Sequence, residues 1–87
     1  MNNREFIKIF DEVDSDFHGD NAFKGLLIIA KYFDVDKTDI ICGGEHDEIY
    51  SVGVDEIIKA GITKEDTLAL ANLNWSIEDE DYLQCFI

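Results

Sequence analysis

Hydrophobic positions recur with helical spacing over the first third of the chain. Residues 3–13 place a stripe of apolar side chains on one face, which predicts an amphipathic helix. A second helix is predicted over residues 21–33, with Asp20 as its N-cap. Its apolar arc is too wide for one buried face, so we expect a central helix covered on several sides. The alternative is an arc that stays partly exposed and drives homodimerisation.

The pattern becomes β-like in the middle of the chain. Two β-prone runs, 39–42 and 49–52, flank a connector that begins with Gly43-Gly44 and together predict a hairpin. Residues 54–60 predict one or two helical turns, which end at Gly61. The segment 39–61 is therefore expected to form a β-hairpin followed by a short helix.

The last third predicts one more helix and one more hairpin. Thr63 begins a variant of the capping box, which opens a helix over residues 64–73. The side chains expected to be buried on that helix are Leu68, Leu70 and Ala71.

Residues 75–87 predict a hairpin whose tip is acidic. The predicted order is α-α-β-β-α-α-β-β, an α+β fold in which a small antiparallel sheet packs on helices. The length indicates one domain, residues 1–87. In the last strand Leu83, Cys85 and Ile87 share one face, and Tyr82, Gln84 and Phe86 share the other.

Charge narrows the classes of partner. The chain holds 20 Asp and Glu against 7 Lys and Arg, a formal net charge of −13. Phosphate binding needs clustered cations, so we expect no direct contact with nucleic acid. An anionic membrane surface would repel the chain for the same reason. Hydrophobic residues make up 46% of the sequence, which favours a folded core over disorder.

Targeting signals and cysteines indicate the compartment. No basic N-terminal region precedes an apolar core, and the longest apolar run, residues 26–30, is far too short to span a bilayer. We therefore expect a cytoplasmic protein. In that compartment Cys42 and Cys85 are predicted to be reduced and mostly buried.

The carboxylates fall into four dense patches. One interpretation is a merely solvated surface, because several acids serve helix starts and turns. The other interpretation is a binding face, because turn chemistry needs one Asp per turn rather than four consecutive carboxylates. The patches are Asp11, Glu12, Asp14, Asp16 and Asp20; Asp34, Asp36 and Asp39; Glu45, Asp47 and Glu48; and Glu78, Asp79, Glu80 and Asp81.

A binding face of this kind predicts a cationic partner. Carboxylates two residues apart on a strand lie roughly 6.6 Å apart, of the same order as neighbouring phosphates on a nucleic-acid strand. Such a face can occupy a Lys/Arg groove that normally holds DNA or RNA, with Tyr82 or Tyr50 as anchors. The predicted partner-binding residues are Glu78, Asp79, Glu80, Asp81 and Tyr82; Glu45, Asp47, Glu48 and Tyr50; and Asp14 and Asp16.

Two segments have the spacing of calcium-binding loops, and both are incomplete. In the first, which begins at Asp14, Gly25 stands where a bidentate Glu is required. In the second, from Asp34 to Glu45, Asp39 replaces the turn glycine. We predict no metal or other cofactor, with a carboxylate-rich calcium module as an alternative. The four zinc-type side chains lack the paired close spacing of a structural site: His18, Cys42, His46 and Cys85.

Catalysis is not expected. Cys42 lies near His46 in sequence and superficially suggests a thiol nucleophile, but the surrounding acids would raise its pKa. A fold of this size also leaves little volume for a substrate cleft. The sequence therefore predicts a protein that is not an enzyme.

A small, very acidic domain without a catalytic motif resembles the inhibitor proteins carried by phages and mobile elements, which include anti-CRISPR and DNA-mimic anti-restriction proteins. The C-terminal half, from His46 onward, is similar to phage-encoded small proteins that end in a Leu-x-x-Leu-x-Trp element and an acidic hairpin. Here that element is the run from Leu70 to Trp75.

The resemblance implies a class and transfers no individual functional residue. That class is a stoichiometric anti-defence inhibitor that binds the basic nucleic-acid-binding surface of a host defence protein, such as a CRISPR effector, in the host cytoplasm. An alternative with the same physics is an immunity- or antitoxin-like protein that masks a nuclease toxin.

Overall fold

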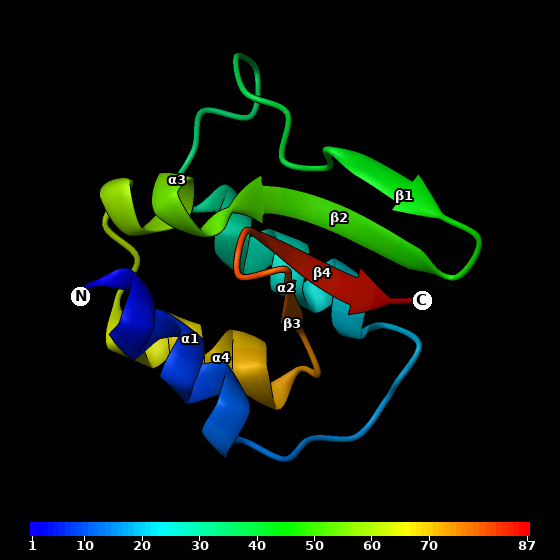
Figure 1. Ribbon diagram of the computed structural model, residues 1–87. Helices are drawn as coiled ribbons and strands as arrows, with labels where there is room; N and C mark the ends of the chain where they lie inside the picture. The colour runs from blue at the N-terminus through cyan, green and yellow to red at the C-terminus, as the bar shows by residue number, and fades with distance from the viewer.

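The computed structural model describes residues 1–87, and its elements follow the predicted order (Figure 1). Four strands form one antiparallel sheet in the order β1-β2-β4-β3. The predicted α+β fold is confirmed. The elements are α1 (Asn3–Glu12), α2 (Asn21–Ala30), β1 (Gly43–Glu45), β2 (Glu48–Gly53), α3 (Val54–Lys59), α4 (Lys64–Asn72), β3 (Ser76–Glu78) and β4 (Tyr82–Phe86).

The helices leave one face of the sheet uncovered. In Figure 1 α2 passes behind β2 and β4, α1 and α4 lie to one side, and no helix crosses in front. Leu83 and Cys85 of β4 are fully buried against the helical side. Their neighbours Tyr82, Gln84 and Phe86 therefore face the open side, because side chains alternate along a strand.

A small core joins the helices to the sheet. Phe6 of α1, Ile29 of α2, Ile57 of α3 and Leu70 of α4 are all completely buried and belong to one cluster with Leu83. A complete capping box occurs at the start of α1, where the Asn2 side chain accepts from the backbone of the third helical residue. None of the four helices has the length and apolar character needed to cross a membrane.

The first hairpin differs from the prediction in one strand. The run 49–52 lies inside β2, as expected, but the strand predicted over residues 39–42 is wrong, because β1 comprises Gly43–Glu45 instead. The two glycines of β1 bring no side chain to the pairing with β2. A Cβ on Gly43 would be in ordinary contact with the Tyr50 ring at 3.4 Å, and one on Gly44 would lie 3.3 Å from the Glu48 carbonyl oxygen. Only two residues then remain for the turn.

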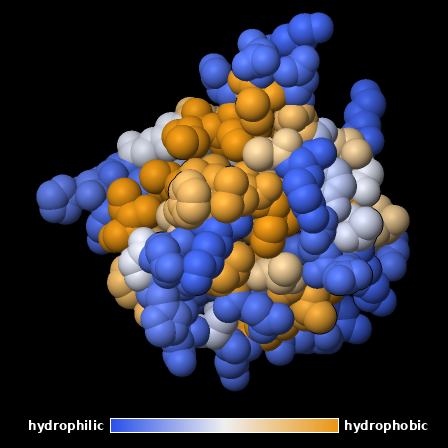
Figure 2. Space-filling view, turned by 180° about the vertical axis from the view of Figure 1, so that it is seen from behind, coloured by the Kyte–Doolittle hydropathy of each residue, from blue (hydrophilic) through white to orange (hydrophobic).

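Helix α2 is shorter and more exposed than predicted. It ends three residues early, at Ala30, and Phe23 and Leu27 are 64% and 56% exposed. The expectation of a central helix covered on several sides is wrong, because only the side that carries Ala22 and Ile29 packs on the core. Figure 2, seen from behind the sheet, shows apolar surface gathered on this side of the molecule.

Two predicted caps are only partly realised. Asp20 stands at the N-cap position of α2 but makes no capping hydrogen bond; its carboxylate pairs with Lys24 Nζ at 3.1 Å. At α4 the Thr63 hydroxyl accepts from Asp66 N at 3.0 Å, as predicted. The reciprocal bond is missing because the Asp66 carboxylate is engaged elsewhere.

The Asp66 carboxylate connects the end of α2 to the start of α4. The Tyr32 hydroxyl donates to it and accepts from Thr63 N at 3.2 Å, and Lys31 Nζ lies 2.7 Å from Asp66 Oδ2. The hydrogen bonds from Lys31 and Tyr32 lower the pKa of Asp66. This network replaces the second half of the capping box.

Replacing Asp66 by asparagine is expected to lower the free energy of unfolding by about 1 kcal/mol near neutral pH. The pKa of Asp66 is lower in the folded than in the unfolded chain, so its stabilisation is complete above the unfolded value of about 3.9 and is lost as pH falls through the folded value. The difference between wild type and Asp66→Asn in urea titrations should therefore shrink in acid. A difference that does not change with pH would assign the effect to packing.

Burial differs from the prediction at three positions. Leu68 on α4 and Cys42 before β1 were expected inside and are exposed, and Ile87 is exposed although it follows the alternation of Leu83 and Cys85. Leu68 lies on the exposed side of α4, whose buried stripe is Thr67, Leu70 and Ala71. Cys42 precedes β1 and Ile87 follows β4, so both lie beyond the ends of the strands. Leu70, Ala71 and Cys85 are buried as predicted, and both cysteines are free thiols.

Trp75 belongs to the core. It is 3% exposed, and its Nε1 donates to the carbonyl of Asn21 at 3.0 Å. The indole lies directly on Gly25, where a Cβ would sit 2.8 Å from Trp75 Cδ1 and closer still to Nε1. The absence of a side chain at Gly25 therefore makes room for the only tryptophan in the protein.

Candidate functional site

Strand pairing gathers side chains from all four strands on the open side of the sheet. Tyr50 lies opposite Gln84, Glu48 opposite Phe86, and Glu78 opposite Tyr82. Residues that are directly opposite share a face. We call this surface the acidic sheet face; its members are Glu45, Glu48, Tyr50, Ser76, Glu78, Tyr82, Gln84 and Phe86.

The sheet carries negative charge without any compensating cation. The two hairpins, residues 43–53 and 76–86, contain seven Asp and Glu and no Lys or Arg. All four ion pairs of the protein involve residues outside these hairpins, so none of the seven carboxylates is neutralised internally. Every basic residue lies in a helix or in the segment between α2 and β1: Arg4, Lys8, Lys24, Lys31, Lys37, Lys59 and Lys64.

One cross-strand pair opposes folding. Glu45 of β1 lies directly opposite Glu48 of β2. Like charges at this position are destabilising, by a few tenths of a kcal/mol up to about 1 kcal/mol. The like charges of Glu45 and Glu48 are therefore not explained by the stability of the hairpin.

Two tyrosines form the centre of the acidic sheet face. The rings of Tyr50 and Tyr82 pack edge to face, with centroids 5.1 Å apart at 71°. The Tyr50 hydroxyl donates to Glu48 Oε1 at 2.6 Å, and this bond raises the pKa of Tyr50. Burial raises the pKa of Tyr82, and the charges of Glu78, Asp79, Glu48 and Asp81 add to the effect. Acidic residues of both hairpins therefore raise the pKa of the same hydroxyl group, that of Tyr82.

The acidic tip is a tight turn with unusual backbone angles. Asp79 and Glu80 have φ of 53° and 57°, and Asp81 N donates to the carbonyl of Glu78 at 2.9 Å. Consecutive positive φ values match the twist of a two-stranded hairpin, but glycine, Asn and Asp are the usual residues there. Glu80 thus occupies a conformation that costs it roughly 1 kcal/mol.

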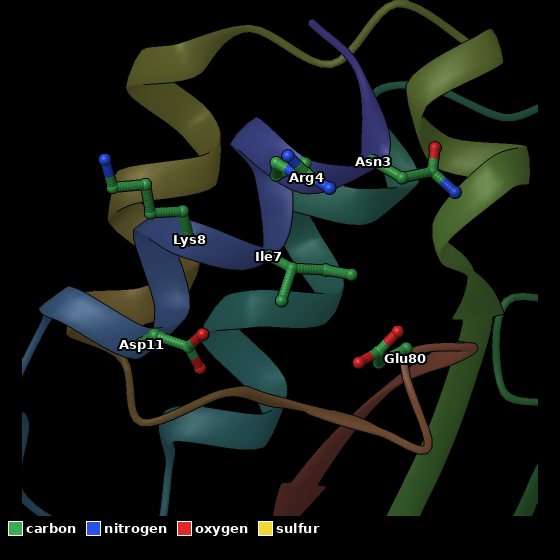
Figure 3. Close-up of a pocket in the computed structure, with 6 residues that line it drawn as sticks. All are labelled: Asn3, Arg4, Ile7, Lys8, Asp11 and Glu80. Atoms are coloured by element: carbon green, nitrogen blue, oxygen red, sulfur yellow. The ribbon is translucent and has the colours of Figure 1, made fainter.

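The four carboxylates of the tip do not form one patch. Glu80 turns away from the acidic sheet face and lines a hollow of about 510 Å³ against α1, where it points toward the same space as Ile7 and Asp11 (Figure 3). Arg4 and Lys8 border the same hollow. Glu78 and Asp81 remain on the side of the tyrosines.

A second hollow, of about 410 Å³, lies at the end of the acidic sheet face next to α3. Glu56 lines it and accepts from Gly53 N at 3.2 Å. Burial raises the pKa of Cys42 at its edge, and Glu56 and Asp39 raise it further, so this thiol stays protonated near neutral pH. The lining residues are Cys42, Tyr50, Ser51, Gly53, Glu56, Asp81 and Tyr82.

Some predicted site residues lie elsewhere. Asp14 and Asp16 belong to the segment between α1 and α2. The carbonyl of Asp16 accepts from Asn21 Nδ2 at 3.1 Å, and the neighbouring Ser15 hydroxyl bonds the Asn74 side chain, so this segment is tied to the helical side. The structure does not join Asp14 and Asp16 to the acidic sheet face.

The site also includes Ser76, Gln84, Phe86 and Glu56, which were not among the predicted partner-binding residues. Gln84 shares the face of Tyr82 by simple alternation, which was a usable signal. No sequence signal pointed to Glu56, because the position of its side chain depends on how the first turn of α3 packs against the end of β2. No group of three or more His, Cys, Asp or Glu side chains is arranged to hold a metal ion.

Comparisons with protein-family models, curated proteins and solved structures found no match to this chain. The site is therefore defined by its own geometry: an uncovered sheet face with unpaired carboxylates around two tyrosines.

Proposed function

We propose that the protein is a non-enzymatic inhibitor whose acidic sheet face occupies the basic nucleic-acid-binding groove of a host defence protein, such as a CRISPR effector. One observation carries the proposal: seven carboxylates on the two hairpins have no ion-pair partner, while all seven Lys and Arg lie elsewhere. A surface of this kind is complementary to a groove lined by Lys and Arg.

The spacing of the charges supports the same occupant. Carboxylates on adjacent strands are separated by roughly 5 Å and those two apart on one strand by roughly 6.6 Å, as in Glu45 and Glu48 on neighbouring strands. The tyrosine pair adds apolar area beside the charges, and Tyr is among the side chains that most often carry interface energy.

The proposal predicts capture that competes with nucleic acid and weakens with salt. The immobilised protein would be incubated with nuclease-treated lysate of its host at about 0.1 M NaCl and eluted at about 1 M, where the Debye length falls from roughly 10 to 3 Å. We expect nucleic-acid-binding proteins in the eluate, and we expect added DNA or RNA to displace them at low salt. Retained proteins that are neither eluted by high salt nor displaced by added DNA or RNA would overturn the proposal.

A further inference from the structure

The hollow beside α3 has the chemistry of a site for one cationic side chain. Resting on the function proposed above, we propose that it receives an arginine of the partner, whose guanidinium packs on the Tyr50–Tyr82 pair. The hollow has a volume of about 410 Å³ and is bordered by these two tyrosines and by the acidic residues Glu56 and Asp81. No Lys or Arg lines it.

The aromatic walls favour a flat cation. The rings of Tyr50 and Tyr82 meet edge to face, so the hollow offers a ring face and a ring edge together. A cation over a tyrosine face is attracted by the ring quadrupole, and guanidinium groups also stack on such faces. An ammonium group gains the first interaction without the second.

The acidic lining favours a ligand with several N–H donors. A guanidinium carries five in a fixed plane, enough to serve the two acidic residues that border the hollow while its flat face packs on a ring. A lysine ammonium presents three donors from a single point. The combination of acidic residues and tyrosine rings therefore selects arginine over lysine.

The test compares oligoarginine and oligolysine peptides of equal length and charge, titrated into the full chain by calorimetry at low salt. We expect the arginine peptide to bind at least about tenfold more tightly, a difference of about 1.4 kcal/mol. The preference should disappear in Tyr82→Leu and shrink in Glu56→Gln, but persist in Tyr82→Phe. Because Glu56 is exposed, Glu56→Gln keeps the test informative should Tyr82→Leu fail to fold.

The outcomes separate this inference from the proposed function. Equal, salt-sensitive binding of both peptides would overturn the arginine site and leave the acidic sheet face as the partner surface. Preference for arginine that survives both Tyr82→Leu and Glu56→Gln would also overturn the site. Failure of both peptides to bind at low salt would overturn the proposed function itself.

Discussion

Replacing Gly25 by alanine is expected to lower the free energy of unfolding by about 3 kcal/mol or more. Intrinsic helix propensity predicts the opposite sign, since alanine in mid-helix is favoured over glycine by roughly 0.8–1 kcal/mol. Packing decides here because the new Cβ would overlap Nε1 and Cε2 of Trp75. The indole cannot retreat easily, because its Nε1 is bonded to the Asn21 carbonyl inside the core.

Gly19→Ala is the matched control. A Cβ added at Gly19 would meet no heavy atom within 4 Å, and the residue has no positive φ, so the same substitution there should be neutral or stabilise by up to about 1 kcal/mol. Urea unfolding followed by Trp75 fluorescence and by circular dichroism would measure both variants. Equal stability of Gly25→Ala and wild type would show that α2 and Trp75 can separate without loss.

Neutralising the acidic sheet face together with the adjoining Asp81 is expected to abolish partner binding while the fold persists. The variant Glu45→Gln, Glu48→Gln, Glu78→Gln and Asp81→Asn should lower affinity for a partner captured as above by about 1,000-fold, or about 4 kcal/mol. Each replacement keeps the shape of its side chain, and the amide oxygen introduced by Glu48→Gln can still accept from Tyr50. Removal of the opposed Glu45 and Glu48 charges should leave stability unchanged or slightly higher.

The control for this variant changes four carboxylates outside the sheet: Asp11, Asp14, Asp16 and Asp36, each to asparagine. Both variants remove four negative charges, so the formal net charge changes from −13 to −9 in each. If the position of the charges matters, the control should bind within about threefold of wild type. Equal losses in the two variants would show that net charge alone drives binding and would discard the acidic sheet face.

The sequence was sufficient for the fold class because local signals agreed with the final structure in most elements. Helical spacing predicted α1, and Thr63 marked the start of α4. Gly61, which has a φ of 95°, marked the end of α3. The errors arose where tertiary context decides. No local sequence signal indicates that α2 is covered on one side only. None indicates that Gly43 and Gly44 pair with β2.

The candidate site was predictable residue by residue but not as a surface. Both tyrosines and the acids of each hairpin stood out in the sequence. Their meeting depends on the pairing of β2 with β4, strands that are separated by two helices along the chain. Periodicity carries no information on that pairing. For the same reason the sequence grouped Glu80 with its neighbours, although the turn directs it toward α1.

Negative charge is denser on the hairpins, which hold seven carboxylates and no cation, than on the rest of the chain, so the molecule has an electric dipole whose negative pole lies on the hairpins. In the field of a positively charged groove such a dipole experiences a torque, so the molecule rotates during diffusion until the hairpins lead. A larger fraction of collisions then occurs in the orientation that allows binding, so the association rate rises. An inhibitor that must reach its target before nucleic acid does would gain most from this faster encounter.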